Sequence, residues 1–488
     1  SASDPSISGL NLHLDRISIG FAQAQELRNA ILALKKQNKP VTCYISYPSN
    51  ISYYIASAAD RIVIAPISQL NLVGLRTELT FYGAALDKLG VNVDLIRIGD
   101  YKTAAETFTE HESSDANKKQ MNRILDNLYD QFVTDIAAGR NLTPDSVINI
   151  INNGPFTSVD AYKFGLVDSL AYFDEYAKQL HKEGKQISLS RYHADSVFTN
   201  SWEKKPLIAV LVTEGEVQPD NYSSFYSRGR SVTPRKVQSS LHQLYKSKPD
   251  AVILRINSPG GFAMAGEEIY HSLDVYARHK KLYVSMANIT ASGGYYYAMA
   301  AQKIFANPAT ITGSIGIFGG KADFKQLYEK LYINKELFKR GKYSAMMSNI
   351  NPFTEEERDK YYYHLRSMYD HFVSLVAGNR EMSADSVDNL GQGRVWTGNE
   401  AAQNGLVDNV GGLKETIDYV VSDLNLNDYD IEIYPQKRPL FILPGRSMLS
   451  PFIKLLTGEK SEDELIESIA PIETAEFYTR LPFDITIQ

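Results

Sequence analysis

The 488-residue sequence contains a single cysteine, Cys43, and has few of the patterns that mark metal, nucleotide or membrane sites. One cysteine excludes an internal disulfide and a cysteine-rich zinc site. No run approaches the ~20 apolar residues that a membrane span needs. There is no His-Glu-x-x-His zinc motif and no Gly-Lys-Ser/Thr phosphate loop. We therefore expect neither a metal nor a cofactor.

Positive charge is not in excess either. The chain has 51 Lys and Arg against 57 Asp and Glu, a net charge of −6, which argues against a nucleic-acid partner. With 43% hydrophobic and 22% charged residues, the composition is that of a globular protein with ample core material. The length predicts two or more domains.

The sequence contains an internal duplication. Residues 52–62 align with 294–304 at an offset of 242, and after a small indel residues 165–168 align with 405–408 at an offset of 240. A nearly constant offset over most of each copy indicates two homologous domains in tandem. We predict domains at residues 1–195, truncated at its start, and 196–428. An unmatched extension, 429–488, is a candidate oligomer contact.

Strand-like and helix-like segments alternate in each copy. Alternation of this kind predicts βαβ units and parallel sheets covered by helices, so the expected fold class is α/β. In the second copy we expect strands at 207–212, 251–256 and 282–286, and helices at 234–246, 265–276 and 361–377.

One turn, Ser292-Gly293-Gly294, stands between an apolar strand and a helix. Taken alone, it is typical of a serine N-cap at a βα junction. The two copies differ there, however. The counterpart of Ser292 is Asn50, whereas Lys102 of the first copy has Ser344 as its counterpart. Each copy thus carries a chemically active group that the other lacks.

Two further glycine-bearing turns occur in the second copy, Pro-Gly-Gly at 259–261 and Thr-Gly-Ser at 312–314. The segments Asn-Ser-Pro-Gly-Gly (257–261), Thr-Ala-Ser-Gly-Gly-Tyr (290–295), Asn-Pro-Ala-Thr-Ile-Thr-Gly-Ser-Ile-Gly (307–316) and Gly-Asp-Tyr-Lys (99–102) resemble the signal peptide peptidase A family, also called protease IV, in its long two-repeat form. The resemblance covers nearly the whole chain. It implies a ClpP/crotonase-like fold in each copy and a membrane-associated serine endopeptidase with a Ser–Lys dyad.

Matching positions assign the roles that the resemblance implies. Ser292 would be the nucleophile, Lys102 the general base, Ser314 the hydroxyl that orients the lysine, and Gly293 and Gly261 the oxyanion-hole donors. A lysine in water has a pKa of ~10.4, so it acts as a base near neutral pH only if burial lowers that pKa. The serine and lysine of one site could come from one chain or from neighbouring subunits.

The resemblance also implies hydrophobic peptide substrates, such as cleaved signal peptides. Phe262, Tyr295 and Tyr296 are expected to border the cleft that binds them. Further expectations are a homo-oligomeric ring or bowl, with a tetramer favoured, and a membrane anchor upstream of residue 1. The expected location is the bacterial inner membrane, with the catalytic domains on the periplasmic side.

Three other functions are left open by the residues. A crotonase-type acyl-CoA enzyme would share the fold but needs catalytic carboxylates. A ClpP-like Ser-His-Asp protease needs a positioned histidine, and His271 and His279 lie outside the glycine motifs. A non-catalytic membrane-associated scaffold would keep the fold without the chemistry.

Overall fold

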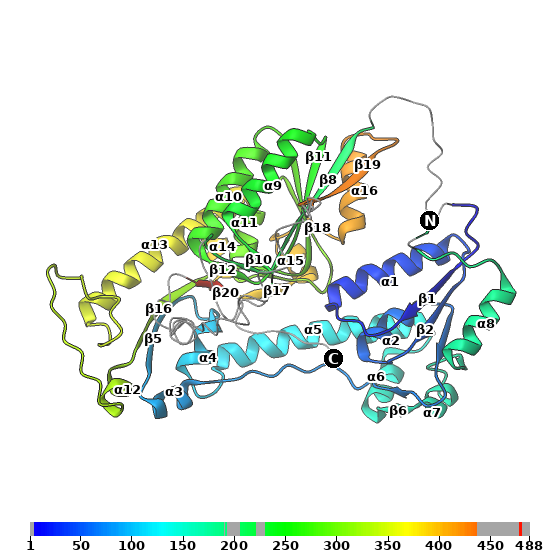
Figure 1. Ribbon diagram of the computed structural model, residues 1–488, viewed down its shortest axis with the longest axis horizontal. Helices are drawn as coiled ribbons and strands as arrows, with labels where there is room; N and C mark the ends of the chain where they lie inside the picture. Colours follow the sequence, from blue (N-terminus) through cyan, green and yellow to red (C-terminus); the bar gives the residue numbers. More distant parts are fainter. Residues whose placement is uncertain (1–3, 190, 193–204, 221–229, 437–477, 481–488) are drawn as a thin grey trace, which may run out of the picture.

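A computed structural model describes residues 4–189, 191–192, 205–220, 230–436 and 478–480. The two repeats lie against each other, the first in blue to cyan and the second in green to orange (Figure 1). No helix in these described ranges is long and apolar enough to cross a membrane.

The first repeat is built on a parallel four-stranded sheet of order β1-β2-β3-β7. Its strands are β1 (Leu10–Leu14), β2 (Val41–Ile45), β3 (Arg61–Ile64) and β7 (Ser169–Leu170). A short antiparallel pair, β4 (Gln69–Leu70) and β6 (Phe156–Thr157), stands apart from the sheet. The helices are α1 (Phe21–Lys36), α2 (Asn50–Ala56), α3 (Gly83–Leu89), α4 (Glu106–Thr109), α5 (Asp115–Arg140), α6 (Pro144–Asn153), α7 (Ser158–Lys163) and α8 (Phe173–Glu183).

The second repeat is built on a larger sheet of order β17-β15-β13-β11-β8-β19, with β14 and β18 continuing from β13. The strands are β8 (Leu207–Glu214), β11 (Ala251–Ser258), β13 (Lys281–Ala291), β14 (Lys303–Ala306), β15 (Ile311–Gly313), β17 (Val395–Thr397), β18 (Asn409–Val410) and β19 (Asp430–Tyr434). The helices are α9 (Pro234–Ser247), α10 (Ala263–Ala277), α11 (Gly293–Ala298), α12 (Lys325–Lys330), α13 (Glu355–Arg380), α14 (Ala384–Leu390), α15 (Gly398–Gln403) and α16 (Leu413–Asp423).

The two sheets repeat one strand order. The second repeat's parallel run β11-β13-β14-β18 corresponds to β1-β2-β3-β7 of the first, and its antiparallel pair β15–β17 corresponds to β4–β6. The expected α/β fold, with tandem units and parallel sheets covered by helices, is confirmed. Because β19 pairs with β8, the second sheet continues past residue 428. Most of the extension, 437–477 and 481–488, lies outside the described residues.

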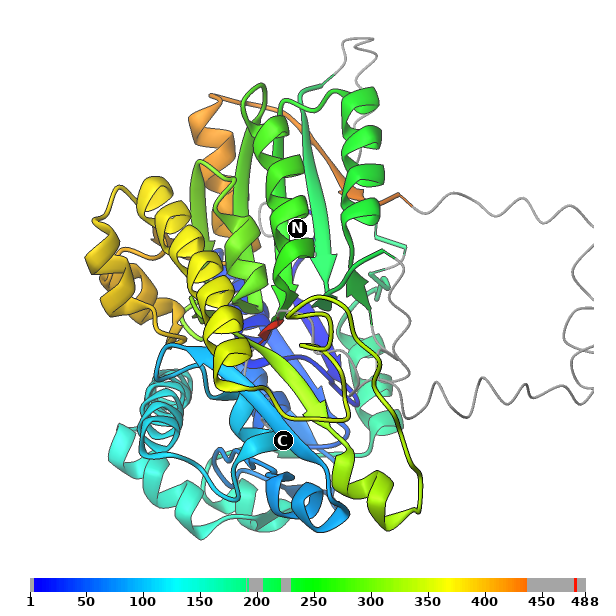
Figure 2. The same ribbon diagram turned by 90° about the vertical axis from the view of Figure 1, so that its left-hand side faces the viewer.

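A third sheet joins the repeats, with order β10-β9-β12-β20-β16-β5 (Figure 2). Its strands are β5 (Asn92–Ile98) from the first repeat, and β9 (Glu216–Val217), β10 (Ser231–Val232), β12 (Gly260–Phe262), β16 (Ile317–Asp323) and β20 (Tyr478–Arg480) from later in the chain. β5 pairs antiparallel with β16 along its whole length, from Ile98 opposite Ile317 to Asn92 opposite Asp323. The first repeat thus completes a sheet of the second.

Polar and apolar contacts also fix the repeats to each other. The first repeat's core includes Ala291, Ile311 and Val395 of the second repeat. Glu26 on α1 forms an ion pair with Arg255 at the end of β11, with 2.8 Å between Oε1 and Nη1. Asn307 donates to the same Glu26 oxygen at 2.8 Å. These partly buried contacts hold the two halves in one arrangement, which a site shared between them requires.

Candidate active site at the junction of the repeats

Ser292 occupies a sharp turn between β13 and α11. Its backbone has φ 55° and ψ −117°, a combination that residues with a side chain rarely adopt. The turn is held on both sides, because Ser292 N–H donates to the Gly313 carbonyl at 2.8 Å and Tyr296 N–H donates to the Ser292 carbonyl at 2.8 Å. The surroundings therefore fix the direction of the serine hydroxyl.

Lys102 reaches this turn because of the strand register. β5 ends at Ile98 opposite Ile317, so the chain that continues past Ile98 runs alongside the residues that precede Ile317. Lys102 lies four positions beyond Ile98, and Ser314 lies three positions before Ile317. The antiparallel pairing thus delivers a first-repeat lysine to a second-repeat serine within one chain.

The three polar side chains meet in direct contact. Lys102 Nζ donates to Ser292 Oγ at 2.7 Å and to Ser314 Oγ at 2.9 Å. It also lies 3.3 Å from the Ser314 carbonyl oxygen. Ser314 has a left-handed backbone with φ 54°, which fixes both of its oxygens toward the amine. No histidine of the described chain bonds to Ser292, and no cluster of three metal-ligating side chains occurs among the described residues.

Burial sets the chemistry of the lysine. Lys102, Ser292 and Ser314 are all 0% exposed. Desolvation disfavours an ammonium ion, and no carboxylate among the described residues offsets this effect, so burial lowers the pKa of Lys102 well below its ordinary value. A lowered pKa increases the share of the neutral amine at a given pH, and a neutral amine has a lone pair that can accept a proton.

A loop that the sequence interpretation missed covers the lysine backbone. Tyr101 N–H donates to the Gln392 carbonyl at 2.9 Å. Gly393 has φ 82°, and a Cβ atom there would lie 2.3 Å from the Lys102 nitrogen. Gly316 is equally constrained, since its Cβ would lie 3.2 Å from Lys102 Cδ. The two glycines let these backbones close over the lysine, and because they lie 77 residues apart (393 − 316), the sequence carries no local signal of their contact.

The two glycines expected to supply backbone donors flank the serine. Gly293 is the first residue of α11, so its N–H has no acceptor within the helix. Gly261 belongs to β12 and has φ 154°, and a Cβ there would lie 2.0 Å from the Val217 carbonyl oxygen. A side chain is excluded at that position, where the backbones of β12 and β9 pack closely against each other.

The counterpart turn of the first repeat has a structural role. Asn50 is buried, its Nδ2 donates to the Gly74 carbonyl at 2.8 Å, and its Oδ1 accepts from Val73 N–H at 3.1 Å. The counterpart of Ser314 is Leu72, a fully buried core residue. An amide that closes a loop and an aliphatic side chain thus replace the reactive hydroxyls.

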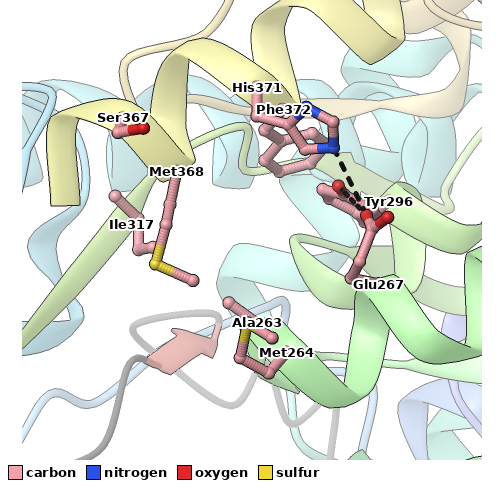
Figure 3. Close-up of a pocket in the computed structure, with 9 residues that line it drawn as sticks. All are labelled: Ala263, Met264, Glu267, Tyr296, Ile317, Ser367, Met368, His371 and Phe372. Atoms are coloured by element: carbon pink, nitrogen blue, oxygen red, sulfur yellow. Dashed lines mark hydrogen bonds and ion pairs between the residues drawn. The ribbon is translucent and has the colours of Figure 1, made fainter. Parts of the chain in front are cut away.

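A cavity of about 290 Å³ opens beside the serine turn (Figure 3). Its lining comes from four elements: the first turns of α10 and α11, the start of β16 and the middle of α13. The residues are Ala263, Met264, Glu267, Tyr296, Ile317, Ser367, Met368, His371 and Phe372.

The three aromatic residues expected to border the cleft take different positions. Tyr296 lines the cavity. Tyr295 is fully buried and its hydroxyl donates to the Leu406 carbonyl at 2.7 Å, so the expectation that it borders the cleft is corrected. Its hydroxyl is satisfied inside the core, where no substrate can reach it. Phe262 is also buried, in the core of the second repeat.

An extended strand already pairs beside the site. The backbone of β20 runs antiparallel to β12, with Thr479 opposite Gly261, and also antiparallel to β16, with Tyr478 opposite Phe318. The slot between β12 and β16 therefore has the width and the hydrogen-bonding edges for one extended peptide.

Comparisons with known proteins agree over most of the chain. The family described as Peptidase family S49 matches residues 33–188 and 275–427, which are equivalent parts of the two repeats. The chain is 30% identical over 456 residues to "Serine protease SPPA, chloroplastic" of Arabidopsis thaliana, an alignment that covers 91% of this chain and 67% of that protein. It is 31% identical over 434 residues to "Protease 4" of Haemophilus influenzae, covering 85% and 70% respectively.

Two further similarities are partial. A protein of Enterococcus faecium with the provisional name signal peptide peptidase SppA is 34% identical over 235 residues, covering 46% of this chain and 66% of that protein. A solved ClpP1 mutant from Listeria monocytogenes aligns at 16% identity with a TM-score of 0.29, over 42% of this chain and 92% of that chain, and this alignment carries no weight for function.

The family match and the relatives that align over most of this chain together define the class of protein, a serine protease. The chain belongs to peptidase family S49.

Proposed function

We propose that the chain is an endopeptidase that uses Ser292 as nucleophile and Lys102 as general base. The observation that carries this proposal is the 2.7 Å contact between Lys102 Nζ and Ser292 Oγ in a fully buried site. The neutral amine accepts the hydroxyl proton as Ser292 Oγ attacks the peptide carbonyl, and the ammonium then gives that proton to the leaving amine. Ser314 Oγ, 2.9 Å from the same nitrogen, holds the lysine in place through both steps.

The oxyanion of the tetrahedral intermediate would be bound by backbone N–H groups of Gly293 and Gly261. A donor at a helix start and a donor on a strand edge are both fixed before the reaction, so they cost no reorganisation when charge develops. The position of Gly293 directly after Ser292 and the side-chain-free backbone at Gly261 support this assignment. Each such donor typically contributes ~3–4 kcal/mol to the lowering of the activation barrier.

The substrate would be a hydrophobic peptide, such as a signal-peptide remnant, bound as an extended strand between β12 and β16. Two observations support this. The backbone of β20 pairs with both strands at that position, and the neighbouring cavity is walled by apolar side chains of α10, β16 and α13. The name of the Enterococcus faecium relative supports signal peptides as the source.

The dyad is tested by hydrolysis of an apolar fluorogenic peptide. Ser292→Ala and Lys102→Ala should each lower kcat by at least ~10²–10⁴-fold, since general-base assistance alone is of that size. Ser240→Ala, a buried serine on α9, and Lys414→Met, an exposed lysine on α16, are controls that should retain activity. If Lys102→Ala keeps the activity of its control, Lys102 is not the base. If neither the wild-type protein nor any variant cleaves peptides, the scaffold alternative holds.

We further propose a head-to-tail homo-oligomeric ring, with a tetramer favoured. Within one chain, β5 of the first repeat pairs with β16 of the second. The duplication offset maps β5 onto residues 334–340 and β16 onto residues 75–81, and neither mapped segment belongs to a strand. Pairing 334–340 of one copy with 75–81 of the next would repeat the internal junction between subunits. Contacts of this heterologous kind close into rings.

The surface of these segments supports the proposal. Residues 331–344 are exposed throughout and carry large apolar side chains, including Tyr332 at 94% and Phe338 at 86% exposure. Exposed apolar side chains in a row indicate an interaction surface. A second copy of the chain is the partner that supplies the complementary edge.

Membrane association, with both repeats on the periplasmic side of a bacterial inner membrane, remains part of the proposal. Its support is the match to bacterial family members such as Protease 4 of Haemophilus influenzae. Flotation of the full natural protein with bacterial membrane vesicles tests it: recovery with the vesicles after a high-salt wash supports association, and recovery in the soluble fraction contradicts it. The domain division at residues 195 and 428 likewise stays a prediction.

A further inference from the structure

The cavity beside Ser292 has two chemically different sides (Figure 3). Ile317, Met368 and Ala263 form an apolar side. Glu267 and His371 form a polar side with the Tyr296 hydroxyl. A cavity for a purely aliphatic side chain does not need a carboxylate in its wall, and the Glu267 side chain, 37% exposed, stands at the edge of the cavity where an entering cation can reach it.

Glu267 is held toward the cavity by its neighbours. The Tyr296 hydroxyl donates to Glu267 Oε2, and His371 Nε2 lies 3.5 Å from the same oxygen. No described residue bonds to Oε1. Burial together with the adjacent Glu267 carboxylate raises the pKa of Tyr296, so this phenol stays protonated and keeps donating. The carboxylate therefore has one oxygen fixed and one oxygen available to a ligand.

The position of the cavity ties it to the proposed peptide slot. Tyr296 lies one helical turn after Ser292 and its N–H donates to the Ser292 carbonyl. Ala263 follows the last residue of β12 directly, and Ile317 is the first residue of β16. The cavity is thus lined by residues that adjoin one end of each strand proposed to hold the substrate backbone. A side chain of that substrate can enter it.

We propose that this cavity is a side-chain subsite and that Glu267 is its specificity-determining residue, selecting a substrate residue with an apolar stem and a cationic end, lysine or arginine. The inference rests on the proposed peptidase function and narrows its substrate class. The volume of about 290 Å³ accommodates the longest side chains, with the stem against Ile317 and Met368 and the cation on Glu267 Oε1. A hydrophobic peptide carrying one basic residue would then be preferred over a uniformly aliphatic one.

The test separates binding from catalysis by using full-length protein carrying Ser292→Ala. The probes are fluorescent apolar peptides in which one position at a time holds lysine or norleucine, which has a similar stem but no ammonium group. We expect one position at which lysine binds at least ~10-fold more tightly than norleucine, as a charge-assisted hydrogen bond provides. Adding Glu267→Gln should lower that preference to within ~2-fold, and added salt should weaken it.

Glu268→Gln is the matched control, because Glu268 is exposed on the same helix and does not line the cavity. It should leave the lysine preference intact. The proposal is overturned if Glu267→Gln leaves the ratio of lysine-peptide to norleucine-peptide affinity unchanged at every position. It is also overturned if the starting protein shows no preference for lysine. Failure of the proposed function has a different signature: the wild-type chain cleaves none of the peptides, whatever Glu267 does to their binding.

Discussion

At the scale of single residues, the main feature is a fully buried lysine that has no counter-ion in the part of the chain that the structure describes. A charged ammonium group there would be costly, and the cost is relieved when the amine is neutral. The contacts of Lys102 Nζ are two serine hydroxyls and one carbonyl, all of them neutral groups. The arrangement therefore favours the basic form that the proposed mechanism uses.

This burial predicts a pH dependence of stability. The folded-state pKa of Lys102 is lowered, so between that pKa and ~10.4 the unfolded chain binds one proton more than the folded chain. The free energy of unfolding should therefore rise with pH in this window, by up to about 1.4 kcal/mol per pH unit from this group. Lys102→Met removes the effect and keeps the volume.

Urea denaturation across that window measures the difference. Relative to wild type, Lys102→Met should be most stabilised at the low-pH end, and the difference should shrink as pH rises. Lys414→Met, at an exposed lysine on α16, is the control and should show no such trend. A constant difference across the window would mean that Lys102 keeps an ordinary pKa.

At the scale of elements, the site depends on three turns and on the loop 391–394, which lies over Lys102. The turns at 259–261, 292–294 and 312–314 carry the donors and hydroxyls, and the loop at 391–394 closes over Lys102. This loop packs most tightly at Gly393. A Cβ atom added there would lie 2.3 Å from the Lys102 nitrogen.

Gly393→Ala should therefore lower activity and stability together. The left-handed backbone alone costs about 1–2 kcal/mol for a residue with a Cβ, and the clash displaces Lys102 from Ser292. Gly165→Ala separates the two effects, because Gly165 has φ 69° but nothing within 4 Å of its Cβ position. Thermal unfolding should show a loss in both variants, and peptide hydrolysis should fall only in Gly393→Ala. Equal activity in the two variants would contradict the proposal that the loop 391–394 holds Lys102 against Ser292.

The sequence allowed the elements to be predicted well where the signal was local or repeated. Apolar alternation and the duplication predicted the strands and helices of the second repeat, and Asn50 opposite Ser292 indicated the second repeat as the one that carries the proposed nucleophile. The pairing of β5 with β16 could not be predicted, because strands more than 200 residues apart carry no mutual local signal. The same holds for the loop that lies over Lys102 and for the inward position of Tyr295.

At the scale of the whole molecule, the duplication explains how one chain makes one site from two halves. β5 of the first repeat pairs with β16 of the second within the chain. The duplication gives each of these strands a counterpart in the other repeat, and the two counterparts could form a second pairing of the same kind. The segments that correspond to β16 and β5 in the other repeat, 75–81 and 334–340, form no strand. The proposed ring uses them between subunits.

Disrupting that second junction should separate subunits without damaging the site. Phe338→Glu combined with Tyr332→Glu places charge in the exposed apolar segment, and light scattering should show a shift from oligomer to monomer. Tyr363→Glu, at an exposed tyrosine on α13, is the control and should leave the mass unchanged. A monomeric wild-type protein, or an oligomer indifferent to the double substitution, would contradict the proposed ring.

The central claim, that Ser292 is activated by the buried Lys102, is tested most directly by a fluorophosphonate probe followed by mass spectrometry of the labelled peptide. We predict a single adduct on Ser292 in the wild-type protein, at a rate that rises with pH as Lys102 loses its proton, and no adduct in a folded Lys102→Met variant. Equal labelling of Ser292 with and without the lysine, or labelling at another serine, would contradict the account.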